Sequence, residues 1–497
     1  MFRANLRRCL LLAFLALQGA CGDDPIDPGN DPANISMVDG SGQDASVGTA
    51  LPDPLRVLVT DADGAPLADI TVTWVVVSGG GSIPSTSVTG QDGVATAVFT
   101  LGPATGEQSA RAELSGVSGS PVTFTATATD DSPQLAFTYL GGGNNVPERY
   151  TSDLWVHGGY AYTGTWYTRT AGNPGNALKV WQLSATGAPG LVNTVTLANV
   201  GTVSDVEVTA DGQLLLATAE AGGGGLYIYS LANPAAPALL GSSPVASGLH
   251  TGTFATIAGR RYVFGARNPT GGGTPPPALM IFDVTDPGAI TVAATVPVPA
   301  TYGIHDTFVR DGIAFAFAWN AGVIIYDVGN GMNGGVPGTP VEISRLITAT
   351  SGVAGGAQVH NGWWFHNPVA SERRYLFIGQ EGPSSIGTAS SGDIHVVDVS
   401  NLAAPVEVAS YRMEGAGTHN FWMDEQKQIL FAAYYNGGVV ALDVSGTLSG
   451  NLAGREIARI RPGGVNNTFV WGVQLYNGSL YASDMLSGLW QLGMSGF

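Results

Sequence analysis

The chain has 497 residues, of which only 12% are charged and 71 are glycine. Its formal net charge of −18 repels nucleic-acid phosphates and anionic headgroups, so we expect no nucleic-acid partner. Few charges, many glycines and segments rich in Val, Thr and Ala indicate an all-β protein with many tight turns, long enough for two or three domains.

The first 21 residues have the pattern of a secretory signal. Three arginines precede an apolar run that is too short to cross a membrane, and small residues precede Cys21. The segment resembles a bacterial lipoprotein leader with Cys21 as the lipidated start of the mature chain. That resemblance implies a lipid anchor at Cys21 and a place in the bacterial cell envelope, outside the cytoplasm. The alternative is cleavage after Ala20, with Cys21 left as a free thiol.

Two further segments precede the larger part of the chain. Residues 22–33 are rich in Pro, Gly and Asp without any hydrophobic period, which predicts a flexible tether. Residues 34–130 contain short alternating strands between turn clusters such as DADG and GQDG, which predicts a β-sandwich. The segments DADGAPLADITVTWVVVSGGGS and GQDGVATAVFTLG resemble a bacterial Ig-like domain of the invasin/intimin group. That resemblance implies Trp74 in the core and a role as a spacer.

From Ser152 to Leu492 one sequence unit recurs about seven times, with roughly 40–50 residues per unit. Each unit has an opening strand, a second apolar strand and a third strand, and most units have a fourth. The third strand ends in an aspartate in four units, at Asp283, Asp327, Asp398 and Asp443. Four strands per unit at this period predict a seven-bladed β-propeller over residues 133–497.

The last unit contains only three strands before the chain ends. Residues 133–141, which precede the first unit, have the same proline, apolar and aromatic character as the fourth strands of other units. We therefore expect residues 133–141 to complete the last blade and close the ring, because an open ring would leave unpaired strand edges.

The third strands and the turns after them resemble the LVIVD-repeat family of bacterial propellers. The segments that carry the likeness include LMIFDVTDPGAI and IHVVDVSNLAAPVEVA. The likeness is good in most units and weak in the first and last. It implies a propeller fold and a surface location rather than a particular reaction.

Four of the seven histidines stand at one position of successive units, where the first two units have serine. These residues and those that follow them are His250 and Thr251, His305 and Asp306, His360 and Asn361, and His419 and Asn420. Because this position begins the innermost strand of a blade, we expect a partial ring around one mouth of the central channel. A ligand site is expected there at His250, His305, Asp306, His360, Asn361, His419 and Asn420.

Two roles fit this histidine set. Converging imidazoles could bind Zn or Cu, with His305, His360 and His419 as ligands and Asp306 beside them. The role that the sequence favours is hydrogen bonding to the backbone, which serine performs equally well and which needs no cofactor. Since adjacent strand positions point to opposite faces, the histidines and the residues after them are not expected to face the same way.

Aromatic residues recur at two other positions. Trp155, Phe308, Trp363 and Trp422 share a position on the first strand, where packing between blades is the simplest expectation. Trp166, Tyr167, Trp319, Tyr434 and Tyr435 lie near the ends of second strands, where packing in the core or at the rim is expected.

The sequence contains no nucleophile elbow, phosphate loop, cysteine-based metal motif or dinucleotide fingerprint, so no catalytic residue is assigned. We expect a binding or scaffold protein, anchored in the cell envelope, that presents a propeller to a protein, peptide or glycan. The alternative is a Zn- or Cu-dependent extracytoplasmic enzyme that uses the histidine ring. Propellers host many unrelated functions, so the fold does not decide between the two.

Overall fold

The computed structural model of the protein describes residues 31–129, 135–143, 147–185, 187–268, 275–298, 303–349, 358–382 and 385–496. The predicted leader with Cys21, most of the predicted tether, and residues 133 and 134 lie outside this part of the chain. The chain divides into two compact units, Met1–Thr129 and Asp130–Phe497. Among the described residues, no helix has the length and apolar character needed to span a membrane.

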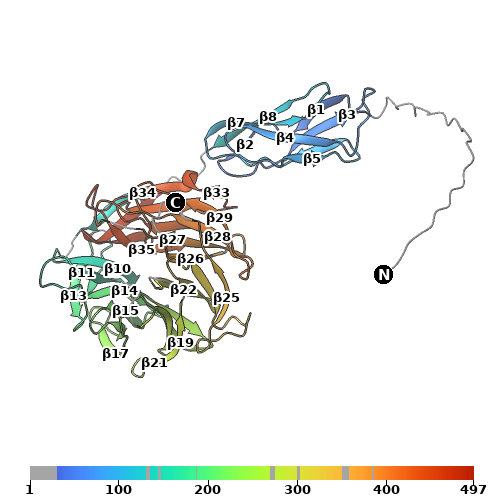
Figure 1. Ribbon diagram of the computed structural model, residues 1–497. Coiled ribbons are helices and arrows are strands. Elements are labelled where there is room, and N and C mark those ends of the chain that lie inside the picture. The colour runs from blue at the N-terminus through green and yellow to red at the C-terminus, as the bar shows by residue number, and fades with distance from the viewer. Residues whose placement is uncertain are drawn as a thin grey trace, which may run out of the picture. The chain divides into compact units, whose positions relative to one another are not determined.

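The N-terminal unit consists of two sheets that share one core (Figure 1). The first sheet has the order β1 (Asn34–Asp39), β3 (Leu55–Thr60), β6 (Val94–Ala97). The second has the order β2 (Gln43–Ser46), β8 (Val122–Thr129), β7 (Gly106–Glu113), β4 (Thr71–Ser78), β5 (Thr86–Val88). Strand β3 alternates buried and half-buried residues, as a strand with one face on a core does. Trp74 of β4 is buried in that core and lies 5.9 Å from Phe124 of β8 between ring centroids.

The C-terminal unit is a β-propeller of four-stranded antiparallel groups. Figure 1 shows first strands such as β10, β14, β22 and β26 near the centre and last strands such as β13, β17, β21 and β25 at the periphery. The first group is β10 (Arg149–His157), β11 (Tyr160–Thr168), β12 (Ala177–Gln182) and β13 (Gly190–Thr196). The second is β14 (Thr202–Val208), β15 (Leu214–Glu220), β16 (Gly225–Ser230) and β17 (Ala238–Pro244). One pairing, between Thr165 and Val203, joins these two groups into a single sheet.

The remaining groups form separate sheets. The third group is β18 (Gly252–Ile257), β19 (Arg260–Arg267), β20 (Ala278–Asp283) and β21 (Thr291–Pro297). The fourth is β22 (Asp306–Arg310), β23 (Ile313–Phe317), β24 (Val323–Asp327) and β25 (Val341–Leu346). The next is β26 (Val359–Asn367), β27 (Glu372–Gln380), β28 (Ile394–Asp398), β29 (Val406–Tyr411), with β33 (Gly450–Asn451) at its edge. Then follows β30 (Phe421–Asp424), β31 (Ile429–Ala433), β32 (Val439–Asp443), β34 (Glu456–Ile460), with a short 3₁₀ helix at Ala453–Arg455.

The last sheet combines segments from both ends of this unit. Its strands are β35 (Val470–Tyr476), β36 (Ser479–Asp484) and β37 (Gly488–Ser495), followed by β9 (Ala136–Gly142). Strand β9 runs antiparallel to β37, and Leu135 before it is buried in a cluster with Phe431, Leu480 and Leu492. The segment before the repeats therefore supplies the fourth strand of the last sheet.

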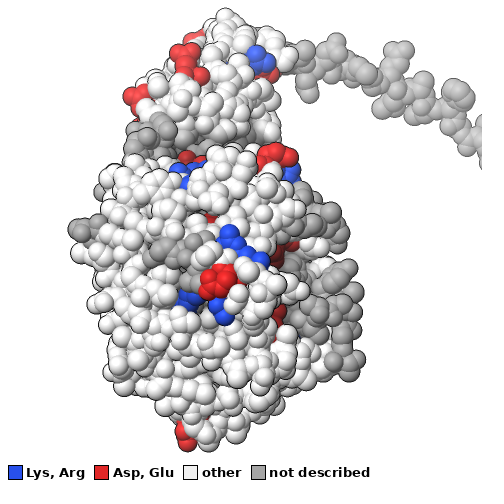
Figure 2. Space-filling view, turned by 90° about the vertical axis from the view of Figure 1, so that its left-hand side faces the viewer, with Lys and Arg blue, Asp and Glu red and all other residues white. Residues whose placement is uncertain are grey.

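Burial follows the position of a strand within its group. The third strand β20 is buried along nearly its whole length, because neighbouring sheets cover both of its faces. The outer strand β17 is mostly exposed. Charged side chains are sparse on the face shown in Figure 2, and acidic and basic side chains lie close together near its centre.

The aspartate that ends the third strand shapes the turn after it. In four units its carboxylate accepts a hydrogen bond of 2.9–3.0 Å from the backbone N–H two residues later, at Thr285, Gly329, Ser400 and Ser445. This arrangement is an Asx turn. The aspartate of the repeat therefore has a structural role in these four units.

Candidate functional site

The first strands of the blades contain an extra residue at the position of the predicted histidine ring. The pairing register of β26 shifts between Val359 and Asn361, and equivalent shifts occur in β10, β14 and β35. In the sixth group the backbone N–H of His419 donates to the carbonyl of Ala433. The N–H of Ala433 donates in turn to the backbone carbonyl of Asn420. Two residues thus face one residue of the partner strand, as in a β-bulge.

The histidines and the residues after them line different cavities. His305 lines one cavity of the propeller centre and Asp306, its neighbour, lines a second one. His250 and His419 line the first cavity with His305, whereas Asn361 and Asn420 line the second with Asp306. The histidines and the residues after them therefore do not face the same way, as the sequence predicts.

Six aromatic side chains close a circle of ring contacts, which we call the histidine level. The circle runs through His250, His305, His360, His419, Trp471 and Trp166, with centroid distances between 3.9 and 5.8 Å. Trp471 holds the histidine position in the last blade, and Trp166 comes from the second strand of the first blade. The predicted partial ring of histidines is thus completed by two tryptophans that the sequence pattern did not assign to it.

The histidines differ in their hydrogen bonds. His250 pairs through Nδ1 with the Glu220 carboxylate, and His419 donates from Nδ1 to the carbonyl of Trp471 at 2.7 Å. Burial lowers the pKa of His250, but the charge and hydrogen bond of Glu220, with the charges of Glu381 and Asp205, together outweigh this effect and raise the pKa above its ordinary value. Neither ring nitrogen of His360, nor Nδ1 of His305, has a hydrogen-bond partner among the described residues. Local hydrogen bonding therefore accounts for His250 and His419 but not for His360.

A carboxylate that the sequence did not indicate faces two of these imidazoles. The Glu381 Oε2 atom lies 3.8 Å from His305 Nε2 and 3.6 Å from His360 Nε2, which is too far for a hydrogen bond. Its other oxygen accepts a hydrogen bond of 2.5 Å from the Tyr435 hydroxyl. Burial raises the pKa of Glu381 to about 6 and lowers that of His360 to about 3. The predicted metal ligands His305 and His360 thus meet Glu381, whereas His419 lies outside this group of ligand atoms.

A cavity of about 260 Å³ adjoins the histidine level. Trp166, Trp319 and Tyr435 help to line it, whereas Tyr434 is fully buried and Tyr167 is exposed. Trp319 and Tyr435 have φ angles of 47° and 41°, a left-handed conformation that is costly for a bulky side chain. Three of the five aromatic residues at second-strand ends therefore face the centre of the propeller.

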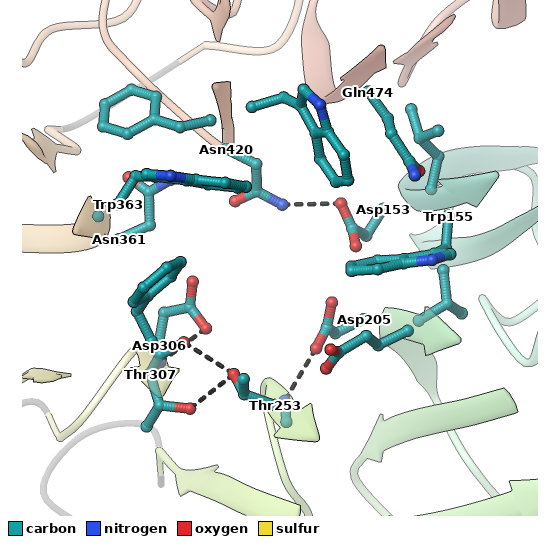
Figure 3. Close-up of a pocket in the computed structure, with 18 of the residues that line it drawn as sticks. Asp153, Trp155, Asp205, Thr253, Asp306, Thr307, Asn361, Trp363, Asn420 and Gln474 are labelled. Atoms are coloured by element: carbon teal, nitrogen blue, oxygen red, sulfur yellow. Dashed lines mark hydrogen bonds between the residues drawn. The ribbon is translucent and has the colours of Figure 1, made fainter. Parts of the chain in front are cut away.

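The second cavity, of about 240 Å³, is acidic. Four carboxylate residues line this acidic cavity, and no Lys or Arg is among the described residues around it. They are Asp153, Asp205, Glu207 and Asp306. Figure 3 shows Asp153, Asp205 and Asp306 turned toward the same space. Asn361 and Asn420, which were predicted beside Asp306, line it as well.

Burial raises the pKa of all four acids. For Asp153 and Glu207 the shift is large, and the negative charge of Asp205 adds to the effect of burial in both. The same two causes raise the pKa of Asp306 to about 7. Hydrogen bonds only partly offset them: Asp205 accepts from the Gly252 N–H at 2.8 Å, and Glu207 from the Phe254 N–H at 2.7 Å. The cavity therefore holds carboxylates that repel one another in a medium with little water.

An arc of aromatic rings forms the wall of the acidic cavity. The centroid distances are 5.3 Å from Phe308 to Trp363, 5.4 Å from Trp363 to Trp422, and 5.8 Å from Trp422 to Trp155. These rings are only partly buried, and Trp155 and Trp363 flank the acids in Figure 3. The expected packing between blades is confirmed by these contacts, and one side of the arc also faces a cavity. The sequence showed that these four residues share one strand position, but it could not show in which direction their side chains point.

The comparisons with known proteins concern the fold. The LVIVD repeat family matches residues 148–167 and 389–413, so one match includes the first unit, where the third-strand pattern is weak. No curated protein sequence matches the chain significantly. The crystal structure of Chaetomium thermophilum Sqt1 is 12% identical, covers 72% of this chain and 86% of its own, and has a TM-score of 0.45. The Myceliophteria thermophila Cps50 (Swd1) β-propeller domain is 10% identical, covers 70% and 97%, and has a TM-score of 0.47.

Proposed function

We propose that this LVIVD-repeat β-propeller is a binding protein whose acidic cavity takes a positively charged group of a partner protein or peptide. A lysine or arginine side chain has the required chemistry. The observation that carries the proposal is the convergence of four carboxylates, one buried and three half-buried, inside an arc of aromatic rings, with no basic residue in the described lining.

A cationic group would relieve the electrostatic cost of this arrangement. Buried carboxylates that repel one another gain from a positive charge placed between them. The faces of Trp155, Trp363 and Trp422 add attraction for a cation, because the centre of an aromatic ring is electron-rich. Ammonium and guanidinium groups carry several N–H donors, whereas the acids and Asn361 offer acceptors. Asn361 Oδ1 is buried without a hydrogen-bond partner among the described residues, and it belongs to the lining.

The proposal also covers the number of blades, the role of the N-terminal unit and the anchor at Cys21. We propose seven blades, based on the seven four-stranded groups, with the strand at residues 133–141 closing the ring. The N-terminal unit would be an Ig-like spacer, supported by its two sheets around a core with Trp74. A lipid anchor at Cys21 would hold both units in the cell envelope, so that the partner would be met outside the cytoplasm.

Calorimetric titration with short peptides tests the binding proposal. The probes are a blocked tripeptide with a central lysine, the same peptide with glutamine in place of lysine, and a neutral oligosaccharide. We expect the lysine peptide to bind and the glutamine peptide to bind much more weakly. Glu207→Gln should weaken binding of the lysine peptide by roughly 10- to 100-fold, the size of one charge-assisted contact.

The matched control is Asp286→Asn, which removes an exposed carboxylate from a turn of the same propeller. This variant should bind the lysine peptide like the unmodified protein. Equal affinity for the lysine and glutamine peptides would contradict the proposal. An equal loss of affinity for the lysine peptide in Glu207→Gln and Asp286→Asn would contradict it as well. Binding of the oligosaccharide alone would assign the cavity to a glycan instead.

A further inference from the structure

We infer that the histidine level holds a divalent transition-metal ion bound by His305, His360 and Glu381. The inference is independent of the proposed cation site, because it rests on other residues and another cavity. Among the described residues, this is the one group of three or more His, Cys, Asp or Glu side chains whose ligand atoms all lie within 4.8 Å of one another.

The distances suit one ion between the three side chains. Glu381 Oε2 lies 3.6 Å from His360 Nε2 and 3.8 Å from His305 Nε2. Ligand atoms at about 2.0–2.2 Å from one tetrahedral ion lie about 3.3–3.6 Å from each other. Small side-chain shifts would thus bring the three atoms to coordination distance, whereas no hydrogen bond forms across the present gaps.

The group also contains buried polar atoms that lack partners. His360 is only 1% exposed, and neither of its ring nitrogens has a hydrogen-bond partner among the described residues. A buried polar atom without a partner costs free energy, so such an atom in a native structure calls for an explanation. Coordination of an ion by an imidazole nitrogen supplies the missing interaction for His360.

Neighbouring residues hold the three side chains in place. The Tyr435 hydroxyl donates to Glu381 Oε1 and leaves Oε2 turned toward the imidazoles. The rings of His305 and His360 pack at 3.9 Å between centroids, and His250 and His419 flank them at 4.1 Å each. Such orientation of ligands by surrounding groups is typical of metal sites, because it fixes both ring position and carboxylate direction.

The ligand set indicates the class of metal and the openness of the site. Two imidazoles and one carboxylate suit borderline ions such as Zn²⁺, Cu²⁺ or Fe²⁺ rather than Mg²⁺ or Ca²⁺, which prefer oxygen ligands. Three protein ligands leave at least one coordination position open for water or another small ligand. His305 and Glu381 both line the cavity of about 260 Å³, so the open position would face that space.

Zinc titration of the full chain tests the inference. The protein is stripped with a chelator, desalted and titrated with ZnCl₂ by calorimetry, and retained zinc is measured by elemental analysis after a second desalting. We expect one zinc ion per chain in the unmodified protein. Glu381→Gln, which keeps the size of the side chain, and His360→Gln should each weaken zinc binding by about 100-fold or more.

Two controls separate this site from others. His395→Gln changes another buried histidine, which pairs with Glu407 away from the histidine level, and should leave zinc binding unchanged. Glu207→Gln changes the acidic cavity and should also leave it unchanged. Loss of zinc in Glu207→Gln but not in Glu381→Gln would overturn the inference, as would substoichiometric zinc in the unmodified chain.

A second measurement guards against variants that fail to fold. The metal-free forms of all variants are compared by thermal unfolding, and zinc is then added. Zinc should raise the melting temperature of the unmodified chain and of His395→Gln but not that of Glu381→Gln. An equal increase in Glu381→Gln would show that the bound zinc lies elsewhere, and the inference would fail even if lysine-peptide binding succeeds.

Discussion

Asn420 donates a hydrogen bond of 2.7 Å from its side-chain amide to Asp153 Oδ1, although 267 residues separate the two. Asp153 lies on the first strand of the first blade, and Asn420 directly precedes the first strand of a blade near the end of the chain. The bond therefore joins the first blade to the sixth at the acidic cavity (Figure 3). It also partly offsets the burial that raises the pKa of Asp153.

Removal of this bond should destabilise the protein. Asn420→Ala leaves a buried acid without its amide donor, and we expect a loss of about 1–3 kcal/mol in the free energy of unfolding. At pH 7 Asn420→Asp should lower the free energy of unfolding more than Asn420→Ala, because a further carboxylate then faces Asp153. At pH 4 the loss caused by Asn420→Asp should be smaller than at pH 7. Urea denaturation at the two pH values measures both effects. A cost for Asn420→Asp that is equal at pH 4 and pH 7 would contradict the arrangement.

The half-buried acid Glu207 should make stability depend on pH. Burial, with the charges of Asp205 and Asp306, raises its pKa well above the ordinary value of 4.5. Between that value and the raised one, the folded chain keeps a proton that the unfolded chain has lost. Stability from this group is therefore complete below 4.5 and falls as pH rises through the raised pKa. As pH rises, the melting temperature of Glu207→Gln should decline less steeply than that of the unmodified chain. Parallel curves of melting temperature against pH for the two proteins would refute this prediction.

Asp327 should have the opposite dependence. Burial acts to raise its pKa, but backbone N–H groups of Asn333, Gly329, Gly335 and Gly331 outweigh it and lower the pKa to about 2. The folded pKa is depressed, so the stabilisation is present above the ordinary value of 3.8 and is lost as pH falls toward 2. Asp327→Asn should therefore be less stable than the unmodified chain at pH 6, by about 1–3 kcal/mol, and nearly equal to it near pH 2. Denaturation at several pH values gives the difference.

The strand before the repeats should stabilise the last sheet. Leu135→Ala removes a buried side chain beside β9, and we expect a loss of about 2–5 kcal/mol in the free energy of unfolding. Leu239→Ala on the outer strand β17 changes a side chain that is 54% exposed and should cost less than about 0.5 kcal/mol. Similar losses in the two variants would mean that the contact of β9 with the last sheet adds little to stability.

The repeat itself was predictable because it is a local pattern. Alternating apolar strands, turn residues and the aspartate that ends four of the third strands are properties of short segments, and they predicted a propeller of four-stranded groups. The shared register of the four histidines was visible for the same reason. Likewise, the pattern before Ser152 indicated that residues 133–141 have fourth-strand character, and β9 lies on β37.

The sequence did not reveal which side chains meet in the channel. Glu381 follows the second strand of one blade and Trp166 lies near the end of the second strand of another, so neither shares the register of the histidines. The bulges at the blade starts, such as those in β26 and β14, leave no distinct pattern in a single sequence, because they depend on pairing with the next strand.

Local residue patterns thus specify the all-β repeat and the residue types at the start of each blade. The acidic cavity walled by tryptophans, and the meeting of the histidine level with Glu381, arise from the packing of the blades. The physical reason is that local propensity fixes strands and turns, whereas the contacts of Asp153 with Asn420 or of His360 with Glu381 require the blades to be arranged around a common centre.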